Sequence, residues 1–167
     1  MTAPESWGKP ASRTISWYPD HSLYKHAAGM SGLEFTQAIV EGRFPPPPIA
    51  SIFGFELVEV SAGESVFRLS PDGSMLNPLG LVHGGTLCTL MDSAIGVAVQ
   101  TASPAGVGYA TIELKVSFLR PLPYDGGVIE ARGKVIQLGR KVAFGEAHCY
   151  NADGKPVGHA TSSLAAI

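Results

Sequence analysis

The chain has 167 residues, enough for one compact domain, and 45% of them are apolar while 16% are charged. Its net charge of -2 supplies no broad basic surface for nucleic acid or an anionic membrane. Neither a membrane span nor a signal peptide is recognisable, so we expect a cytoplasmic protein with no membrane partner, and the apolar surplus favours self-association.

The first part of the chain is predicted to be an extension rather than part of the domain. Residues 1–30 mix Pro, Ser, Gly and aromatics without a period, as in a segment that is disordered or lies against a folded body. Ser31 with Glu34 three residues later is a capping-box signature, which predicts a short helix reaching Val40. The run Pro45–Pro48 favours polyproline II and predicts a stiff spacer.

The remainder reads as one α+β domain. An apolar segment with a single charged side chain, Gly85–Gln100, predicts a largely buried helix. Alternating segments of strand length lie on both sides of it, the first two as a hairpin and the last four as an antiparallel meander: Phe55–Val60, Ser65–Leu69, Tyr109–Leu119, Val128–Leu138, Val142–Asn151 and Val157–Ala166. We therefore expect an extension over 1–48 and, over 49–167, a curved antiparallel sheet wrapped around one central helix.

Two adjacent glycines precede the buried helix. Gly84 and Gly85 leave the first backbone amides of that helix unobstructed, and those amides have no partner inside the helix. Such amides, at the positive end of the helix dipole, can stabilise an oxyanion. The alternative is that the glycines only permit a tight turn or close packing.

A carboxylate lies within the same helix. Asp92 shares a helix face with small or polar residues, namely Gly85, Cys88, Thr89 and Gly96. An unpaired ionised group is costly to bury, so Asp92 should be hydrogen-bonded, shifted in pKa, or directed at a cavity or a partner chain. A purely structural hydrogen bond is the alternative to a catalytic role.

The neighbouring polar residues are less specific. His83 can orient the loop or contact a substrate, and Asn77 can hold a water or only form an Asn-Pro turn. No metal site is expected, because His83 and Asp92 have no third ligand at a recognisable spacing. Cys88 in an apolar helix is a poor nucleophile, and its spacing from Cys149 fits no disulfide framework.

Together these residues resemble a known family. Asn77-Pro-x-Gly-x-x-His-Gly-Gly, then Asp92, then the segment from Thr111 to Phe-Leu-Arg-Pro121 is similar to the PaaI-like hot-dog acyl-CoA thioesterases, over about residues 49–166. The resemblance implies the hot-dog fold and hydrolysis of an acyl-CoA to a free acid and coenzyme A. Coenzyme A is then part of the substrate, and no separate cofactor is expected.

The resemblance also implies roles for single residues. Asp92 would be the nucleophile or the general base, and the Gly84 amide the oxyanion donor. Asn77 and His83 would help to place the thioester or a water, and Thr111 would align the nucleophile. Each site would lie between subunits, with Asp92 from one chain and the Gly84 loop from the other. The protein would then be at least a homodimer, and a homotetramer is expected because members of this family commonly form one.

Coenzyme A brings phosphates, which need local cations. Arg120, Arg140 and Lys141 are the candidates, with Gly85 as a further substrate contact; ordinary solvated charge is the alternative for all three. Apolar residues such as Phe53, Leu79 and Leu81 would line the acyl pocket. Two other activities stay open, a hot-dog hydratase or dehydratase of enoyl or hydroxyacyl thioesters, and an acyl-CoA-binding module without turnover.

Overall fold

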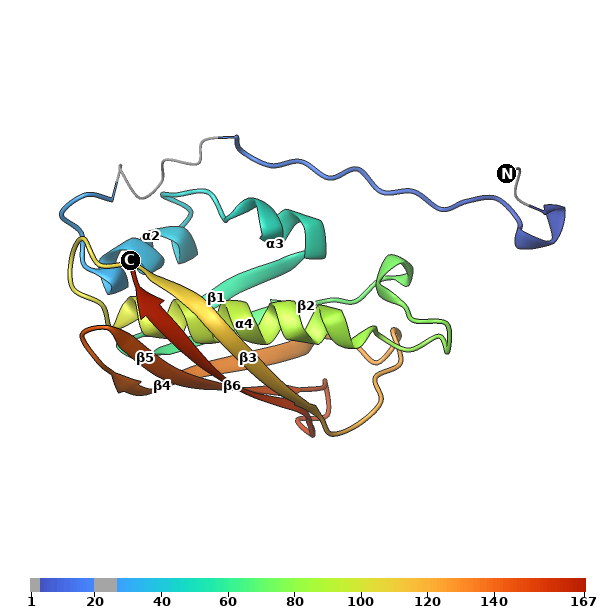
Figure 1. Cartoon of the computed structure of the whole chain (residues 1–167). Helices are drawn as coiled ribbons and strands as arrows, with labels where there is room; N and C mark the ends of the chain where they lie inside the picture. Colours follow the sequence, from blue (N-terminus) through green and yellow to red (C-terminus); the bar gives the residue numbers. More distant parts are fainter. Residues whose placement is uncertain (1–3, 20–26) are drawn as a thin grey trace.

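The computed structural model describes residues 4–19 and 27–167. Six strands form one antiparallel sheet: β1 (Phe55–Ser61), β2 (Glu64–Leu69), β3 (Tyr109–Phe118), β4 (Ile129–Leu138), β5 (Val142–Tyr150) and β6 (Pro156–Ala166). The sheet curves around the long helix α4 (Gly84–Thr101), which runs along its inner face (Figure 1). This arrangement confirms the predicted α+β hot-dog fold, and each predicted strand lies within one or two residues of an observed one.

The order of the strands differs from the predicted meander. The sheet has the order β1-β2-β4-β5-β6-β3, so β3 pairs with β6 at the edge of the sheet and β4 pairs with β2. Only β4, β5 and β6 are joined as a meander, through the short turns at 139–141 and 151–155. The prediction for β3 was wrong because the connection from β3 to β4, residues 119–128, is long enough to cross the end of the sheet.

Glycine lets the helix approach the sheet closely. One side of α4 is fully buried against the sheet through Leu90, Met91, Ala94, Ile95 and Val99. Opposite it, a Cβ added at Gly133 would lie 2.2 Å from the carbonyl oxygen of Ala94, and one at Gly145 would lie 2.6 Å from the Ile95 side chain. Any side chain at these two positions would push the helix away, so the close packing depends on their being glycine.

The other side of α4 is only partly covered. Its residues alternate in pairs between fully buried and half-buried, and the half-buried face comprises Gly85, Cys88, Thr89, Asp92, Ser93, Gly96 and Val97. A Cβ added at Gly96 would meet no atom within 4 Å. This face of small and polar residues therefore has room for a ligand or another chain.

The last part of the extension, from Ser31 onward, packs on the domain. Helix α2 (Gly32–Val40) begins with the predicted capping box, in which Ser31 and Glu34 bond each other's backbone amides, and it packs on β1 and α4. The proline run is less of a spacer than predicted, because Pro48 is the first residue of a short helix, α3 (Pro48–Phe53). Proline is well tolerated there, since the first amide of a helix needs no partner.

The described chain also contains two short 3-10 turns and an extended N-terminal arm. Two 3-10 turns lie at Glu5–Trp7 (η1) and Gly73–Met75 (η2). Arg13 of the extended N-terminal arm forms an ion pair of 2.8 Å with Asp72 just before η2. Trp7 and Trp17 are mostly exposed and do not anchor the arm.

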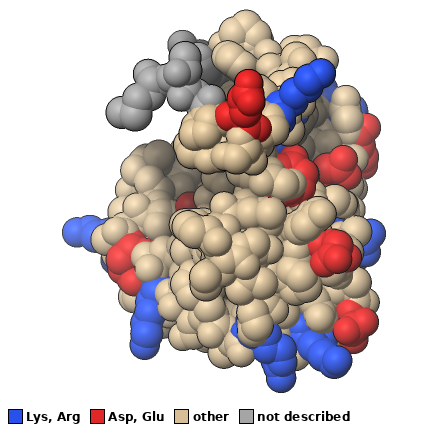
Figure 2. Space-filling view, turned by 90° about the vertical axis from the view of Figure 1, so that its right-hand side faces the viewer, with Lys and Arg blue, Asp and Glu red and all other residues tan. Residues whose placement is uncertain are grey.

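One end of the molecule carries charges of both signs. Figure 2 views the end of the molecule at which α4 begins, and there Lys and Arg alternate with Asp and Glu around a mainly uncharged area. In the described ranges no helix is long and apolar enough to cross a membrane. Within those ranges Cys88 and Cys149 are both free thiols.

Candidate active site

Asp92 and Thr111 are brought together by the packing of α4 against β3. The Thr111 hydroxyl donates a hydrogen bond of 2.8 Å to Asp92 Oδ1. Among the described residues no other donor bonds the Asp92 carboxylate, so Oδ2 keeps its lone pairs for a further partner. The carboxylate is thus held at one oxygen and available at the other.

A β-bulge directs Thr111 toward the helix. Thr111 pairs with the buried Leu164 of β6, whereas Glu113, two residues on, pairs with Ser163, which faces the other side of the sheet. Ile112 between them has no partner in the ladder and is exposed. Bulges re-aim side chains, and this one changes the alternation at Ile112 so that Thr111, and with it Tyr109, lines the cavity on the inner face.

A cavity of about 310 Å³ opens beside Asp92. Asp92, Ser93 and Thr111 supply its polar end, and the rest of its wall is mostly hydrocarbon, from residues including Phe35, Ile39, Pro46, Phe55, Phe67, Val97 and Tyr109. An apolar cavity with a few convergent polar groups is typical of a binding site for a small apolar ligand. We take this cavity, with Asp92 at its end, as one half of the candidate active site.

The second half lies where α4 begins. His83 is the N-cap of α4, and its Nδ1 accepts a hydrogen bond of 2.9 Å from the Gly85 amide. The Thr86 amide donates to the His83 carbonyl. In the described part of the chain the Gly84 amide has no acceptor, so it is the donor that an incoming oxyanion can use. The Gly85 amide, in contrast, is already bonded to His83.

Asn77 shapes the loop in front of this amide. Its Oδ1 accepts hydrogen bonds from the amides of Leu79 and Leu81, at 2.9 and 3.2 Å. A groove of about 380 Å³ runs beside the loop, and Asn77, Gly84, Phe118 and Arg120 are among the residues that line it. Asn77 therefore fixes the loop through its side-chain oxygen, and this loop leads directly into α4, whose first residue supplies the free Gly84 amide.

The two halves are too far apart in one chain to act on one carbonyl group. Asp92 follows Gly84 by eight residues of α4, which corresponds to a rise of about 12 Å at about 1.5 Å per residue. A base and an oxyanion donor must each lie within about 3 Å of atoms of the same reacting group. Asp92 and Gly84 also line separate hollows.

The predicted cations are divided between the two ends of α4. Arg120 lines the groove beside Gly84, and its guanidinium donates to the Pro156 carbonyl. Arg140 and Lys141 lie in the β4–β5 turn, where the Tyr109 hydroxyl donates to the Gly139 carbonyl at 3.0 Å. Tyr109 starts β3 and also lines the Asp92 cavity, so this turn lies beside that cavity. Neither Arg140 nor Lys141 forms an ion pair with a described residue.

Neither cysteine is suited to be a nucleophile. Burial raises the pKa of the Cys88 thiol, and the negative charge of Asp92 adds to that increase. Burial raises the pKa of the Cys149 thiol to about 12. Both thiols therefore stay protonated near neutral pH, and the thiolate is the reactive form.

The wall of the cavity was the main feature that the sequence did not reveal. Phe53, Leu79 and Leu81 were predicted to line the acyl pocket, but Phe53 packs on the core, Leu79 is 81% exposed, and Leu81 lies in the groove beside Gly84. The wall comes instead from the core strands and from the extension, through α2 and Pro46. The apolar residues of α2, which recur at helical spacing, were the available signal, because the apolar face of a helix packs against another part of the protein.

Comparison with known proteins identifies the family of the chain. Residues 79–157 match the family model described as the thioesterase superfamily. A candidate esterase of Halobacterium salinarum is 32% identical over 65% of this chain and 74% of its own length. The acyl-coenzyme A thioesterase PaaI of Escherichia coli is 27% identical over 65% of this chain and 74% of its own length.

Solved structures show the same fold. The structure of E. coli PaaI, from the phenylacetic acid degradation operon, superposes with a TM-score of 0.72 at 21% identity, covering 82% of this chain and 96% of that one. A phenylacetic acid degradation-related protein of Ralstonia eutropha, a candidate thioesterase, has a TM-score of 0.71 at 28% identity, covering 78% of this chain and 98% of its own. The chain therefore belongs to the thioesterase superfamily, among its PaaI-like members with the hot-dog fold.

Proposed function

We propose that the protein hydrolyses an acyl-CoA thioester to a free acid and coenzyme A, with Asp92 as the catalytic carboxylate. The observation that carries the proposal is the Asp92 carboxylate, fixed by Thr111 at one oxygen and open at the other, at the polar end of an apolar cavity. A carboxylate in that position serves a reaction on the carbonyl group of a bound apolar acyl chain. The match to the thioesterase superfamily supports the same reaction class.

The reaction follows from the donors and acceptors described above. A water bound to Asp92 loses its proton to the carboxylate and adds to the thioester carbon, or Asp92 itself adds and the resulting anhydride is then hydrolysed. In either case the carbonyl oxygen becomes negative and accepts the Gly84 N–H, and the carbon–sulfur bond breaks to release the coenzyme A thiolate, which takes up a proton.

Two chains are needed to complete one site in this proposal. The 12 Å rise between Gly84 and Asp92 estimated above is about twice the distance that a base and an oxyanion donor on one carbonyl can span. The half-buried face of α4 and the edge strand β3 are the surfaces that a second copy would cover. Ile112 and Phe118 on that edge are 58% and 55% exposed, and a long apolar edge strand favours pairing with another chain.

The cavity favours an apolar acyl group, either aromatic or of medium length. Its wall offers hydrocarbon from Ile39, Phe67 and Val97, and none of the described residues that line it is a Lys or Arg able to bind a second carboxylate. The phosphates of coenzyme A would then remain at the surface. Arg140 and Lys141, in the turn beside the cavity and without an ion pair to a described residue, are the candidates to bind them.

The test is a panel of straight-chain and aryl acyl-CoA substrates, with release of free thiol measured by a thiol-reactive dye. Wild-type protein should release coenzyme A, and Asp92→Asn should lower kcat/KM at least ~100-fold with unchanged secondary structure, since a general base contributes that much. Asp153→Asn, a change of the same kind in the exposed β5–β6 turn, should leave the rate unchanged.

Two results would refute the assignment. One is an Asp92→Asn variant with the wild-type rate; the other is a wild-type protein that releases no thiol from any member of the panel. Including crotonyl-CoA and following its enoyl absorbance separates hydration from hydrolysis in the same experiment.

A further inference from the structure

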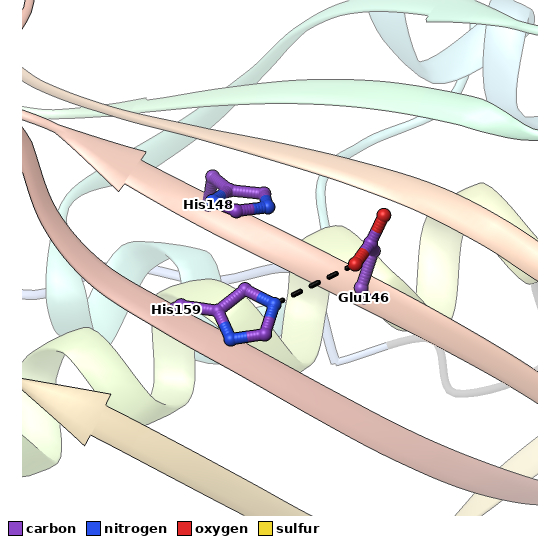
Figure 3. A group of neighbouring side chains, drawn as sticks. All are labelled: Glu146, His148 and His159. Carbon is purple, nitrogen blue, oxygen red and sulfur yellow. Dashed lines mark ion pairs between the residues drawn. The ribbon is translucent and has the colours of Figure 1, made fainter.

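Three potential metal ligands meet on the face of the sheet opposite α4. Glu146 and His148 lie on β5, two residues apart, so their side chains point to the same side. His159 on β6 is the direct cross-strand partner of His148. Ala147, which lies between Glu146 and His148 on β5, is buried on the face that packs on the helix. The three potential ligands therefore lie on the outer face (Figure 3).

The spacing of the ligand atoms suits a small divalent ion. One ligand atom from each residue lies within 4.8 Å of the others, and His159 Nε2 lies 3.5 Å from Glu146 Oε2. The rings of His148 and His159 have centroids 4.5 Å apart. Ligand atoms around a tetrahedral Zn²⁺ are about 3.3 Å apart, as follows from Zn–N bonds of about 2.0 Å. Small rotations of the side chains would therefore bring all three atoms to one ion.

The nearby cations already have partners. Arg132, opposite His148 on β4, bonds Glu130 at 2.6 Å, and Lys134, opposite Glu146, lies 3.6 Å from Glu64. Their charges are partly balanced by those carboxylates. The Glu146 carboxylate thus has only His159 as an ion-pair partner among the described residues, which leaves its charge available for an added ion.

An open hollow gives access to two of the three ligands, Glu146 and His148. Glu146 and His148 line one side of a cavity of about 260 Å³, which also borders Arg132, Lys134 and Tyr150. An ion can enter from solvent through this hollow, and a water or small anion can occupy its fourth coordination position.

We propose that Glu146, His148 and His159 bind one Zn²⁺ per chain on the outer face of the sheet. Two imidazoles and one carboxylate form a donor set that zinc favours, whereas Mg²⁺ and Ca²⁺ prefer oxygen donors alone. The site is separate from Asp92, which lies on the other side of the sheet. Sequence spacing could not reveal it, because only the pairing of β5 with β6 brings His159 to His148.

The test is a calorimetric titration of the full chain, stripped of metal, with ZnCl₂ near neutral pH. We expect one ion per chain, and His148→Gln, His159→Gln and Glu146→Gln should each weaken binding at least ~10-fold, because even outer-shell partners of metal ligands contribute that much. Glu59→Gln, a matched carboxylate change elsewhere on the wall of the hollow, should leave binding unchanged.

Thermal unfolding supplies an independent measurement. Zn²⁺ in excess should raise the Tm of the wild type and of Glu59→Gln, but not that of the double variant His148→Gln, His159→Gln. The Tm without metal shows whether each variant is folded, and the isosteric Glu146→Gln carries the test if the double variant is not. Absence of binding, or equal affinity in the wild type and the three single variants, would overturn the proposal.

Discussion

Thr111 is the residue whose contribution can be separated most cleanly from binding. Its hydroxyl forms a hydrogen bond only to Asp92 Oδ1 among the described residues, so it acts on the reaction by positioning that carboxylate. Thr111→Val keeps the shape and deletes the donor. We expect kcat to fall about 10-fold with little change in KM, since the lost hydrogen bond to a charged group is worth about 1.5–3 kcal/mol and only part of it acts in the transition state.

Thr111→Ser is the control for this prediction, because it keeps the hydroxyl and removes only a methyl group. It should retain most of the wild-type kcat. Equal losses of kcat in the Val and Ser variants would show that the methyl group matters rather than the hydrogen bond, and would remove Thr111 from the positioning role.

The site could be predicted at the residue scale only in part. Asp92 on a buried helix and the glycines before it follow from composition and helical spacing alone, whereas the pairing of Thr111 with Asp92 came only from the resemblance to a family. The hydrogen bonds of His83 and Asn77 were not predictable, because each side chain had several backbone partners within reach.

At the scale of elements, the contact between α4 and the sheet depends on Gly133. Gly133→Ala would place a methyl group 2.2 Å from the backbone oxygen of Ala94, which cannot move without shifting the helix. We expect the free energy of unfolding to fall by about 1–3 kcal/mol, the usual cost of overpacking a core. The measurement is the midpoint of urea unfolding at fixed protein concentration.

Gly73→Ala provides the comparison, because a Cβ there meets nothing within 4 Å and the backbone has no positive φ. It should change the free energy of unfolding by less than about 0.5 kcal/mol. If Gly133→Ala were equally neutral, the helix would not be held as close to the sheet as described.

The elements themselves were largely predictable, and their order was not. Alternating apolar residues and turn residues marked every strand, and a long apolar segment marked the buried helix. Burial of one face of an element imposes the period of that element on the sequence. The position of β3 beside β6 depends instead on where the chain crosses the end of the sheet, which no local pattern encodes. The apolar face of α2 was visible in the sequence, but not that it would cover this cavity.

At the scale of the whole molecule, each proposed site combines Asp92 of one chain with Gly84 of another. Gly84→Pro removes the proposed oxyanion donor with little change to the backbone, because proline suits the first position of a helix and His83 already has the extended conformation that precedes proline. Gly84→Ala adds a Cβ, which meets the side chain of Phe118, but keeps the N–H. It is therefore the control for crowding.

The most direct test mixes Gly84→Pro chains with Asp92→Asn chains, each inactive alone, by co-expression with different tags. A mixed dimer would contain one intact site, made from Asp92 of the first chain and Gly84 of the second. With random pairing we predict recovery of about a quarter of the wild-type acyl-CoA hydrolysis. Purified mixed dimers that stay as inactive as the two parents would contradict a site shared between subunits.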